Sequence, residues 1–270
     1  MASAEYESAL FEVIYRIKAA NRADADQIAN AVCVEQSVEI PPEVVPGHVR
    51  SSIAQLLSLS ALDENNWHAA IGFPRHLFGS DPTQFLNVLF GNVSLLPGIQ
   101  VTDLDKGQLS EFLHGPSFGV EGIRKLADVF DRPLSCTALK PVGLSQDDLA
   151  TRAEQFSNGG LDMIKDDHGL ADQTCAPFRA RVKACVAAID RGMQASGKKT
   201  LYFPNITTSP HYILDRYHEA VEYGADGVLV SAQLCGLSIL NKLAAIGEVP
   251  VMAHPSFSGS LVISNSRGIE

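Results

Sequence analysis

The sequence predicts an α/β protein in which an N-terminal α+β domain, residues 1–125, precedes a domain of the TIM (β/α)8 type, residues 126–270, that is incomplete after its fifth strand. From about residue 132 onward, five apolar strand-like runs alternate with helical stretches, which is typical of a parallel sheet. Before residue 125, strands and helices follow one another without this rhythm. A doubly wound sheet is the second possibility, and it ranks lower because no GxGxxG motif follows the first strand.

The N-terminal domain contains two predicted strands and two predicted helices. Residues 10–17 are rich in β-branched and aromatic residues, as strands are, and residues 67–73 are a second strand candidate. Residues 24–32 place apolar side chains on one side of a helix. Asp81 is a predicted N-cap followed by Pro82 at the first helical position, so we expect a second helix from there to about residue 90.

In the second domain, predicted strands alternate with predicted helices. Ser145 with Asp148 resembles a capping box, and Gly159 and Gly224 are expected as left-handed helix stops. A closed (β/α)8 barrel takes about 250 residues, and residues 133–270 are far fewer. We therefore expect either a sheet that is not a closed barrel or a chain that lacks about three βα units. The predicted strands cover residues 134–140, 161–165, 200–205, 227–231 and 249–254, and the predicted helices cover 145–156, 179–195, 210–223 and 236–245.

The composition excludes several classes of protein. With 46% apolar and 19% charged residues, the chain can bury an ordinary core. Its net charge of −10 argues against binding to nucleic acid. No apolar run has membrane-spanning length, and the N-terminus lacks the basic and apolar regions of a secretion signal. Five cysteines without CxxC or zinc-ligand spacing are typical of reduced cysteines in a cytoplasmic protein.

Four ionisable residues, Lys165, Asp166, Asp167 and His168, lie where the second barrel strand ends. Burying such groups together is costly unless they are paired or hold a metal, and the carboxyl ends of barrel strands carry catalytic residues. Because alternate residues of a strand point to opposite faces, Lys165 and Asp167 are expected to share a direction. Two oxygen donors and a modified lysine suit a hard cation such as Mg²⁺. The alternative is a solvated turn that caps the next helix.

Three further polar residues end predicted strands. Lys140 follows an apolar strand, where desolvation would lower the pKa of a lysine and make it a plausible base; the alternative is a lysine that extends from the rim into water. Asn205 ends the third strand. His254 ends the fifth, where it is either catalytic or a hydrogen-bonded structural residue. Glu35 and Asn92 carry no local signal of function.

Four motifs, together with a stretch near the C-terminus, point to a known family: Gly159-Gly-Leu-Asp-Met-Ile-Lys-Asp-Asp, Arg132-Pro-Leu-Ser-Cys-Thr-Ala-Leu-Lys-Pro, His114-Gly-Pro-Ser-Phe-Gly-Val, Phe90-Gly-Asn-Val and the stretch Met252-Ala-His-Pro-Ser-Phe-Ser-Gly259. With these motifs the chain resembles the large subunit of ribulose-bisphosphate carboxylase (RuBisCO), from roughly residue 11 to the end. The first two motifs together are highly specific. The C-terminal stretch resembles the non-carboxylating branch, the RuBisCO-like proteins.

The resemblance implies an N-terminal α+β domain, a (β/α)8 barrel and a homodimer in which the N-terminal domain of one subunit covers the barrel mouth of the other. Lys140 corresponds to the lysine that takes a proton next to the substrate carbonyl. Lys165 corresponds to the lysine that reacts with CO2 to form a carbamate, which with Asp167 and the ligand position now occupied by His168 holds Mg²⁺. His254 corresponds to a barrel histidine near the substrate.

The resemblance also implies roles for four further residues. Asn92 and Glu35 correspond to residues that reach the partner subunit's site. Thr137 and Asn205 are expected to bind substrate.

The chain departs from the carboxylases at several of these positions. The third metal ligand of the family is glutamate, and here His168 takes its place, which removes a negative charge and favours softer metals. The Lys-Pro-Lys of the carboxylases is Lys140-Pro-Val142, so the lysine that assists CO2 addition is missing. Pro255 stands in place of a phosphate-binding arginine, and Asn92 stands where the enolases of methionine salvage have a lysine base. The mobile-loop lysine and much of the phosphate site correspond to positions beyond Glu270.

These features predict an enolising RuBisCO-like enzyme, of the isomerase or decarboxylase (lyase) type, that acts with Mg²⁺ on a phosphorylated ketose or keto acid and does not fix CO2. Lys140 or a neighbour would remove the proton, and the cation on carbamylated Lys165 and Asp167 would stabilise the enediolate. The alternative is a non-catalytic or regulatory dimer that keeps the fold. A third possibility is a barrel aldolase that uses Lys140 as a Schiff base.

Overall fold

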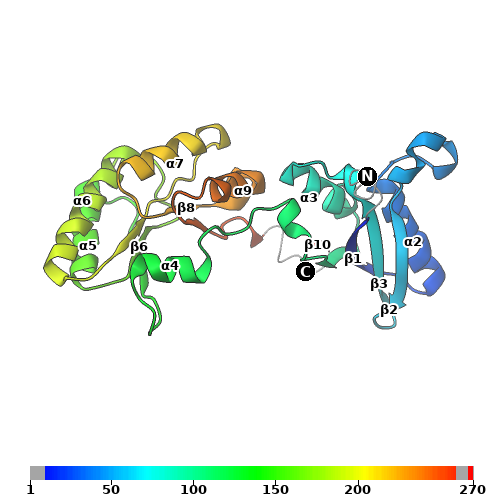
Figure 1. The fold of residues 1–270 in the computed structure, drawn as a ribbon, viewed down its shortest axis with the longest axis horizontal. Coiled ribbons are helices and arrows are strands. Elements are labelled where there is room, and N and C mark those ends of the chain that lie inside the picture. Colours follow the sequence, from blue (N-terminus) through cyan, green and yellow to red (C-terminus); the bar gives the residue numbers. More distant parts are fainter. Residues whose placement is uncertain (1–9, 260–266, 270) are drawn as a thin grey trace, which may run out of the picture. The chain divides into compact units, whose positions relative to one another are not determined.

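The computed structural model describes residues 10–259 and 267–269, and it divides the chain into two compact units (Figure 1). The first unit comprises residues 1–113 and 258–270, and the second comprises residues 114–257. Each unit has its own hydrophobic core, and each is described separately below.

The first unit is a five-stranded sheet with the order β10-β4-β1-β3-β2. The pairs β1–β3, β1–β4 and β2–β3 are antiparallel, and β10 is parallel to β4. The strands are β1 (Leu10–Lys18), β2 (Gln55–Ala61), β3 (Asn66–Pro74), β4 (Ile99–Leu104) and β10 (Arg267–Ile269).

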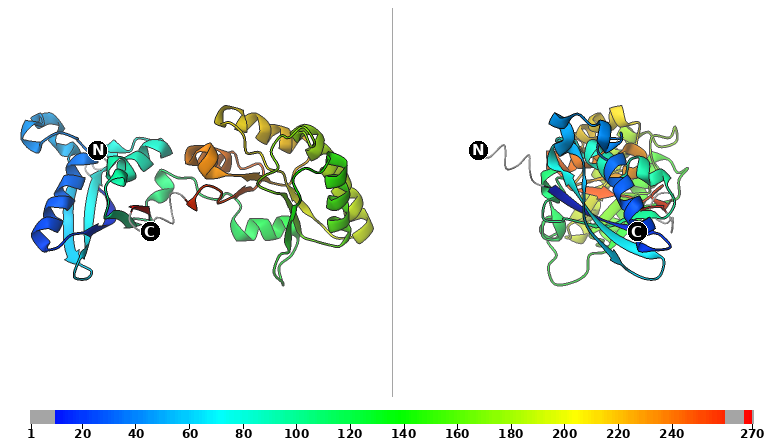
Figure 2. Two further views of the ribbon diagram at one scale, coloured as in Figure 1. Left: turned by 180° about the vertical axis from the view of Figure 1, so that it is seen from behind. Right: turned by 90° about the vertical axis from the view of Figure 1, so that its right-hand side faces the viewer.

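Alternation along β1 builds the core of this unit. Phe11, Val13, Tyr15 and Ile17 are fully buried, as every second residue of a strand with one covered face should be. They pack with helices α2 (Arg22–Glu35) and α3 (Pro82–Phe90), and α2 runs along the sheet in Figure 2. The Tyr15 hydroxyl donates to the carbonyl of Leu89 at 2.7 Å, which ties the sheet to the end of α3.

The described part of the second unit contains a three-stranded sheet, β5-β6-β7, and a two-stranded sheet, β8-β9. Pairs β5–β6, β6–β7 and β8–β9 are parallel, and a parallel bridge between Asn205 and Leu229 links β7 to β8. Helices α5, α6, α7 and α9 share one core with the strands (Figure 1), and α4 packs in a separate cluster with residues of β6 and β7. The elements are α4 (Gly119–Ala127), β5 (Cys136–Leu139), α5 (Gln146–Asn158), β6 (Met163–Asp166), α6 (Phe178–Ser196), β7 (Leu201–Phe203), α7 (Ile213–Glu222), β8 (Val228–Val230), α8 (Ala232–Cys235), α9 (Leu237–Ile246) and β9 (Val251–Ala253).

Local sequence explains how α5 and α6 are placed. The capping box of Ser145 and Asp148 begins α5, as predicted. Gly192 of α6 lies against α5 so closely that an added Cβ would come within 2.6 Å of the Cβ of Ser157, so only glycine fits there. None of the helices in the described part of the chain is long and apolar enough to cross a membrane. The cytoplasmic location stays a prediction.

All the predicted strands and helices are present, with ends shifted by a few residues, and the parallel α/β class is confirmed. Strands β2, β4 and β10 and helices α4 and α8 were not predicted. The left-handed stop was also placed one residue early, because Gly159 has φ −69° and Gly160 has φ 78°.

The boundary between the two units differs from the expected division at residues 125 and 126. Helix α4 belongs to the second unit because Ala127 packs with Met163, Leu201 and Phe203. Strand β10 belongs to the first unit, where it pairs with β4.

A charged pair fixes the entry to β5 and β6. The guanidinium of Arg132 donates two hydrogen bonds of 2.7 Å to the buried carboxylate of Asp162, which also accepts from the backbone N–H and hydroxyl of Ser135. The Arg132 hydrogen bonds lower the pKa of Asp162 far below its usual range, against the opposing effect of burial. Residues 132–135 and 162 are therefore held together just before the strands that carry the candidate site.

Replacing Arg132 with methionine should lower the free energy of unfolding by about 1–3 kcal/mol near neutral pH, because the buried carboxylate keeps only Ser135 as donor. The folded-state pKa of Asp162 lies below that of the unfolded chain, so this stabilisation is present above about pH 4 and is lost as the pH falls. Denaturant titrations of both proteins should therefore differ less at about pH 3 than at neutral pH.

The matched control is Arg191→Met, which breaks an exposed ion pair between Arg191 and Glu154 and should cost at most about 1 kcal/mol. Equal losses in the two variants, or a difference that grows toward acid pH, would contradict the assignment.

Candidate functional site

The end of β6 brings the predicted cluster of ionisable residues together. Asp166 is fully buried and its carboxylate reaches Arg181 of α6, whereas Asp167 contacts Lys140 at the end of β5. Lys165 is half-buried, and its Nζ donates to the backbone carbonyl of Asp166 at 3.1 Å. The four residues therefore do not act together. Asp166 pairs with Arg181 inside the core, and the remaining charged groups lie toward the carboxyl end of the strands.

Asp167 lies at the centre of the candidate site. Its Oδ1 is 3.3 Å from Lys140 Nζ and 3.6 Å from His168 Nδ1, and its Oδ2 accepts the backbone N–H of Gly169 at 3.3 Å. Burial raises the pKa of Asp167, but the Gly169 hydrogen bond and the charges of Lys140 and His168 outweigh it, so the net pKa is lowered. The residue is thus an ionised carboxylate next to two potential cations.

His168 and His254 stack on each other, with ring centroids 4.6 Å apart and ring planes 12° apart. Burial, His168 and Lys165 together lower the pKa of His254, and Asp167 opposes them only in part. The backbone N–H of Ser256 donates to His254 Nδ1 at 3.1 Å. A neutral His254 therefore carries its hydrogen on Nε2, a tautomer assigned from this hydrogen bond.

Hydrogen bonds of hydroxyl groups hold residues 254–256, the segment that carries His254, in place. Ser256 Oγ bonds to Ser231 Oγ at 2.8 Å, and the backbone N–H of Ser231 donates to Thr207 Oγ1 at 2.9 Å. Thr207 in turn donates to Asn205. The ends of β7, β8 and β9 are thus connected by side-chain hydrogen bonds that the sequence analysis did not identify.

The side chain of Asn205 forms hydrogen bonds with other groups of the protein. It is fully buried, its side-chain amide donates to the carbonyls of His168 and Leu170 at 2.9 Å, and its Oδ1 accepts from Thr207. Its expected role in substrate binding does not agree with this geometry, because its polar atoms are committed to the loop after β6. Asn205 supports the site.

Thr137 is not brought to the site either. In the β5–β6 register Thr137 pairs with Ile164, and Ala138 pairs with Lys165. Paired residues of parallel strands point to the same side, so Thr137 shares the side of Ile164 and Leu139, which lie in the core beneath the helices. The residue of β5 that neighbours Lys165 is Ala138.

Lys140 reaches the site but is not desolvated. Its side chain is 63% exposed and forms the ion pair with Asp167. Of the two interpretations of Lys140, the lysine that extends from the rim into water agrees with the structure and the desolvated lysine does not: β5 ends at Leu139, and Lys140 lies beyond the strand, where water reaches it.

Glu35 and Asn92 lie in the first unit and contact each other. Asn92 Nδ2 donates to Glu35 Oε1 at 2.8 Å. Buried Gln36, next to Glu35, donates to the carbonyls of Asn87 and Val88 and accepts the backbone N–H of Val93. Gln36 therefore fixes the turn that presents Asn92, a function that the sequence did not indicate.

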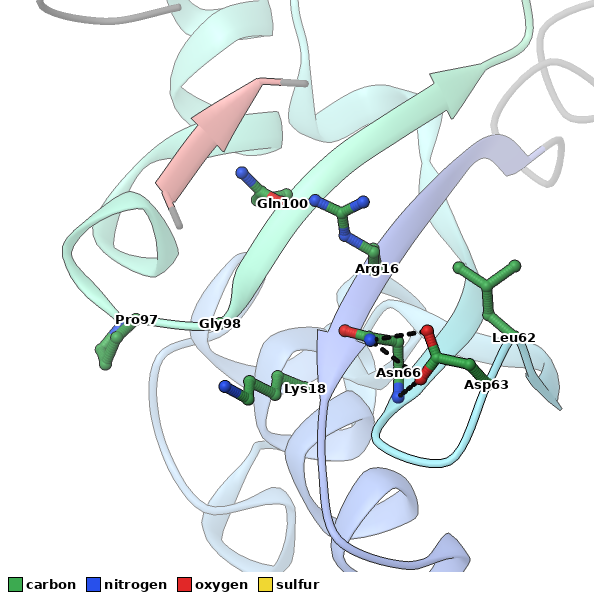
Figure 3. Close-up of a pocket in the computed structure, with 8 residues that line it drawn as sticks. All are labelled: Arg16, Lys18, Leu62, Asp63, Asn66, Pro97, Gly98 and Gln100. Carbon is green, nitrogen blue, oxygen red and sulfur yellow. Dashed lines mark hydrogen bonds between the residues drawn. The ribbon is translucent and has the colours of Figure 1, made fainter. Parts of the chain in front are cut away.

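A polar hollow of about 590 Å³ in the first unit contains none of the predicted site residues (Figure 3). Arg16 from β1 lies beside Gln100 from β4 and bonds to it, and Asn66 donates to Asp63 at 2.9 Å. The hollow combines basic and acidic side chains that are bonded to neighbouring residues. Its size alone does not make it the functional site.

The donors at the end of β6 fit a divalent cation under one condition. Among residues 10–259 and 267–269, no three His, Cys, Asp or Glu side chains are grouped as a metal site. Asp167 and His168 supply one oxygen and one nitrogen side by side, and the third donor has to come from Lys165. A protonated lysine cannot bind a cation, so the set fits only if Lys165 is converted to a carbamate, which supplies oxygen.

Comparison with known proteins identifies the family. The family model for the catalytic domain of the ribulose bisphosphate carboxylase large chain matches residues 119–270. The chain belongs to this family, and its relatives include RuBisCO-like proteins.

Two curated relatives and one solved structure illustrate the similarity. The chain is 34% identical over 252 residues to a 5-methylthioribulose-1-phosphate isomerase of Rhodospirillum rubrum, covering 91% of this chain and 67% of the relative. It is 33% identical over 251 residues to a 2,3-diketo-5-methylthiopentyl-1-phosphate enolase of Bacillus licheniformis, covering 90% and 62%. A RuBisCO-like protein from Rhodopseudomonas palustris superposes with a TM-score of 0.85 at 33% identity, covering 96% of this chain and 71% of that structure. The chain thus spans about two thirds of the length of these relatives.

Replacing His168 with asparagine should raise the pKa of His254, because the substitution removes one of the groups that lower it. The measurement is an NMR titration of the His254 ring protons in both proteins. His48→Asn, an exposed histidine of the first unit, is the control and should leave the titration unchanged. A His254 titration that is the same with and without His168 would contradict the stacked arrangement.

Replacing Gln36 with leucine should lower the free energy of unfolding by about 1–3 kcal/mol, because the carbonyl of Val88 and the backbone N–H of Val93 lose this partner in a buried place. It should also change the side-chain amide resonances of Asn92. Gln27→Leu, on the exposed face of α2, is the control and should leave both quantities unchanged. Unaltered Asn92 resonances in Gln36→Leu would show that the turn does not depend on Gln36.

Proposed function

We propose that the chain forms the site of a non-carboxylating, enolising RuBisCO-like enzyme that acts on a phosphorylated ketose or keto compound. The observation that carries the proposal is the meeting of Lys140, Asp167, His168 and His254 beyond the ends of β5, β6 and β9. The names of the relatives support it, because an isomerase of a ketose phosphate and an enolase of a diketone phosphate both move a proton next to a carbonyl group.

Lys140 is the proposed base. To accept the proton next to the carbonyl, its Nζ has to leave Asp167 and lose its own proton to solvent. His254 is proposed to donate its Nε2–H to the substrate oxygen on which negative charge develops. This division of roles follows from the hydrogen bond of Ser256 to Nδ1, which leaves Nε2 as the donor.

Carbamylated Lys165, Asp167 and His168 are proposed to hold Mg²⁺. The carbamate forms when the neutral Nζ of Lys165 adds to the carbon of CO2 and releases a proton to solvent. A bound divalent cation polarises a carbonyl group and stabilises the enediolate oxygens. The nitrogen ligand of His168 distinguishes this donor set from one with three carboxylate-type groups.

We infer that the reaction does not include CO2 fixation. The side chain two residues after Lys140 is Val142, which offers no cation to assist addition of CO2. Moving a proton next to a carbonyl group does not need a cation at this position.

The quaternary and domain arrangement are proposed on the same basis. We propose that β5–β9 correspond to the first five strands of a (β/α)8 barrel and that the enzyme is a homodimer. In that dimer Glu35 and Asn92 would reach the site of the partner subunit, and their hydrogen bond would fix the orientation of the Asn92 amide.

A non-catalytic or regulatory dimer is the second candidate. Two observations favour it. A histidine stands at position 168, and Lys140, the proposed base, forms an ion pair with Asp167, the proposed metal ligand. A protein of this kind needs no CO2-dependent binding of Mg²⁺.

The test is solvent deuterium exchange into a panel of phosphorylated ketoses and keto acids, followed by NMR, with Mg²⁺ and bicarbonate. Exchange should require both additives and should fall by at least about 100-fold in Lys140→Ala, because a general base contributes at least that factor. Lys183→Ala, a lysine of α6 that lies over the Tyr223 ring, is the control and should leave exchange unchanged. Exchange that persists in Lys140→Ala and in Lys165→Ala would exclude the proposed roles, and no exchange with any substrate would favour the non-catalytic dimer.

A further inference from the structure

Arg181 of α6 bonds to the end of β6 and to two places in the loop that carries Asp167 and His168. This loop, residues 167–177, joins β6 to α6. The side chain of Arg181 is completely buried, and its Nε donates to Asp166 Oδ2 at 3.1 Å. Its other two nitrogens donate to the carbonyls of Ala176 at 2.7 Å and Ala171 at 2.9 Å. One rigid guanidinium thus bonds to the strand end and to two places in the loop.

Asp166 is the matching anchor on the strand. It lies between Lys165 and Asp167 and is fully buried. Besides Arg181, it accepts a hydrogen bond from the hydroxyl of Tyr202 at 2.8 Å and one from the backbone N–H of Asn205 at 2.9 Å. Burial and the charge of Asp166 raise the pKa of Tyr202 well above its usual value, so the phenol stays protonated and donates.

The directions of the neighbouring side chains depend on this anchor. Because successive residues of a strand point to opposite sides, fixing Asp166 toward α6 directs its strand neighbour Lys165 away from α6. Asp167 follows directly after the strand, and its carboxylate reaches Lys140. The amide of Asn205 binds the carbonyls of His168 and Leu170, so the same network also holds the residues that follow. A shift of Asp166 would therefore move the proposed ligands together.

A gain in folding stability does not by itself explain a buried ion pair. Taking two charges out of water is costly, and an apolar pair of similar volume often gives equal or greater stability. What an apolar pair cannot supply is directed hydrogen bonding from one planar group to three acceptors. The geometry is therefore better explained by a requirement for position than by a requirement for stability.

We propose that Arg181, acting through Asp166 and the loop carbonyls, is a positioning residue for Lys165, Asp167 and His168. Its consequence for catalysis rests on the proposed function, and its consequence for geometry does not. Neither Arg181 nor Asp166 touches the substrate or the reacting atoms in this assignment.

The test uses Arg181→Lys, which keeps the charge but cannot bond to three acceptors, and the double variant Asp166→Asn/Arg181→Met, which removes both buried charges. The readout is the NMR ring-current shift of the His168 and His254 protons, which exists because the two rings stack at 4.6 Å. Circular dichroism and thermal unfolding report separately whether each variant is folded. Arg191→Met, on the same helix with an exposed ion pair, is the control.

Both Arg181 variants should lose the ring-current shifts of His168 and His254, whereas Arg191→Met should keep them. Tyr202→Phe, which removes one uncharged donor to Asp166, should shift the same resonances to a smaller extent. Folded variants with the resonances of the wild type would overturn the proposal. If the two charged-pair variants fail to fold, wild-type resonances in Tyr202→Phe would overturn it equally.

Turnover distinguishes this proposal from the proposed function. With a substrate found by deuterium exchange, Arg181→Lys should lower kcat by about 100-fold, as expected when reacting groups are misplaced by about 1 Å, with little change in KM. If the wild type catalyses no exchange, the proposed function fails while the NMR comparison still decides whether Arg181 positions the loop. A change in KM alone, with kcat unaltered, would contradict a positioning role.

Discussion

The second unit depends on one interaction, the buried ion pair between Asp166 and Arg181. Both side chains are fully buried, which is tolerable only because they neutralise each other and their remaining polar atoms are bonded. The pair joins the end of β6 to α6 and to the loop between them. Asn205 and Tyr202 extend the network to β7. The exposed charged residues around Asp167 are therefore presented by a rigid, fully bonded support.

The repeating part of the fold was predictable because each element carries its own local signal. Short apolar runs, the capping box at Ser145 and the proline after Asp81 mark elements without reference to the rest of the chain. Strand β2 was missed because its residues are mostly exposed, so its sequence lacks a clear apolar alternation. In strand β4, Asp103 breaks the apolar alternation that Ile99 and Val101 begin, and α4 has no side-chain cap at its start. Tertiary packing, which sequence periodicity does not encode, stabilises these elements.

The candidate site was predictable as a region but not in its details. The strand end at Lys165 and Asp167 could be located from the run of charges after apolar residues, whereas the directions of Thr137 and Asn205 depend on strand register and loop bonding. Arg181 had an available signal: it falls among Phe178, Val182 and Cys185, which are buried on the same face of α6. An arginine within an apolar stripe needs a buried partner, and the aspartate between the predicted ligands is that partner.

The proposed function requires that the end of β6 is a reactive centre in which Lys165 is modified and Asp167 and His168 complete a cation site. The most direct measurement is ¹³C NMR of the protein equilibrated with ¹³C-labelled bicarbonate, with and without Mg²⁺. We expect a carbamate resonance that Mg²⁺ strengthens, that Lys183→Ala keeps and that Lys165→Ala lacks. A protein with no carbamate resonance, or with one that survives the loss of Lys165, would contradict the proposed function.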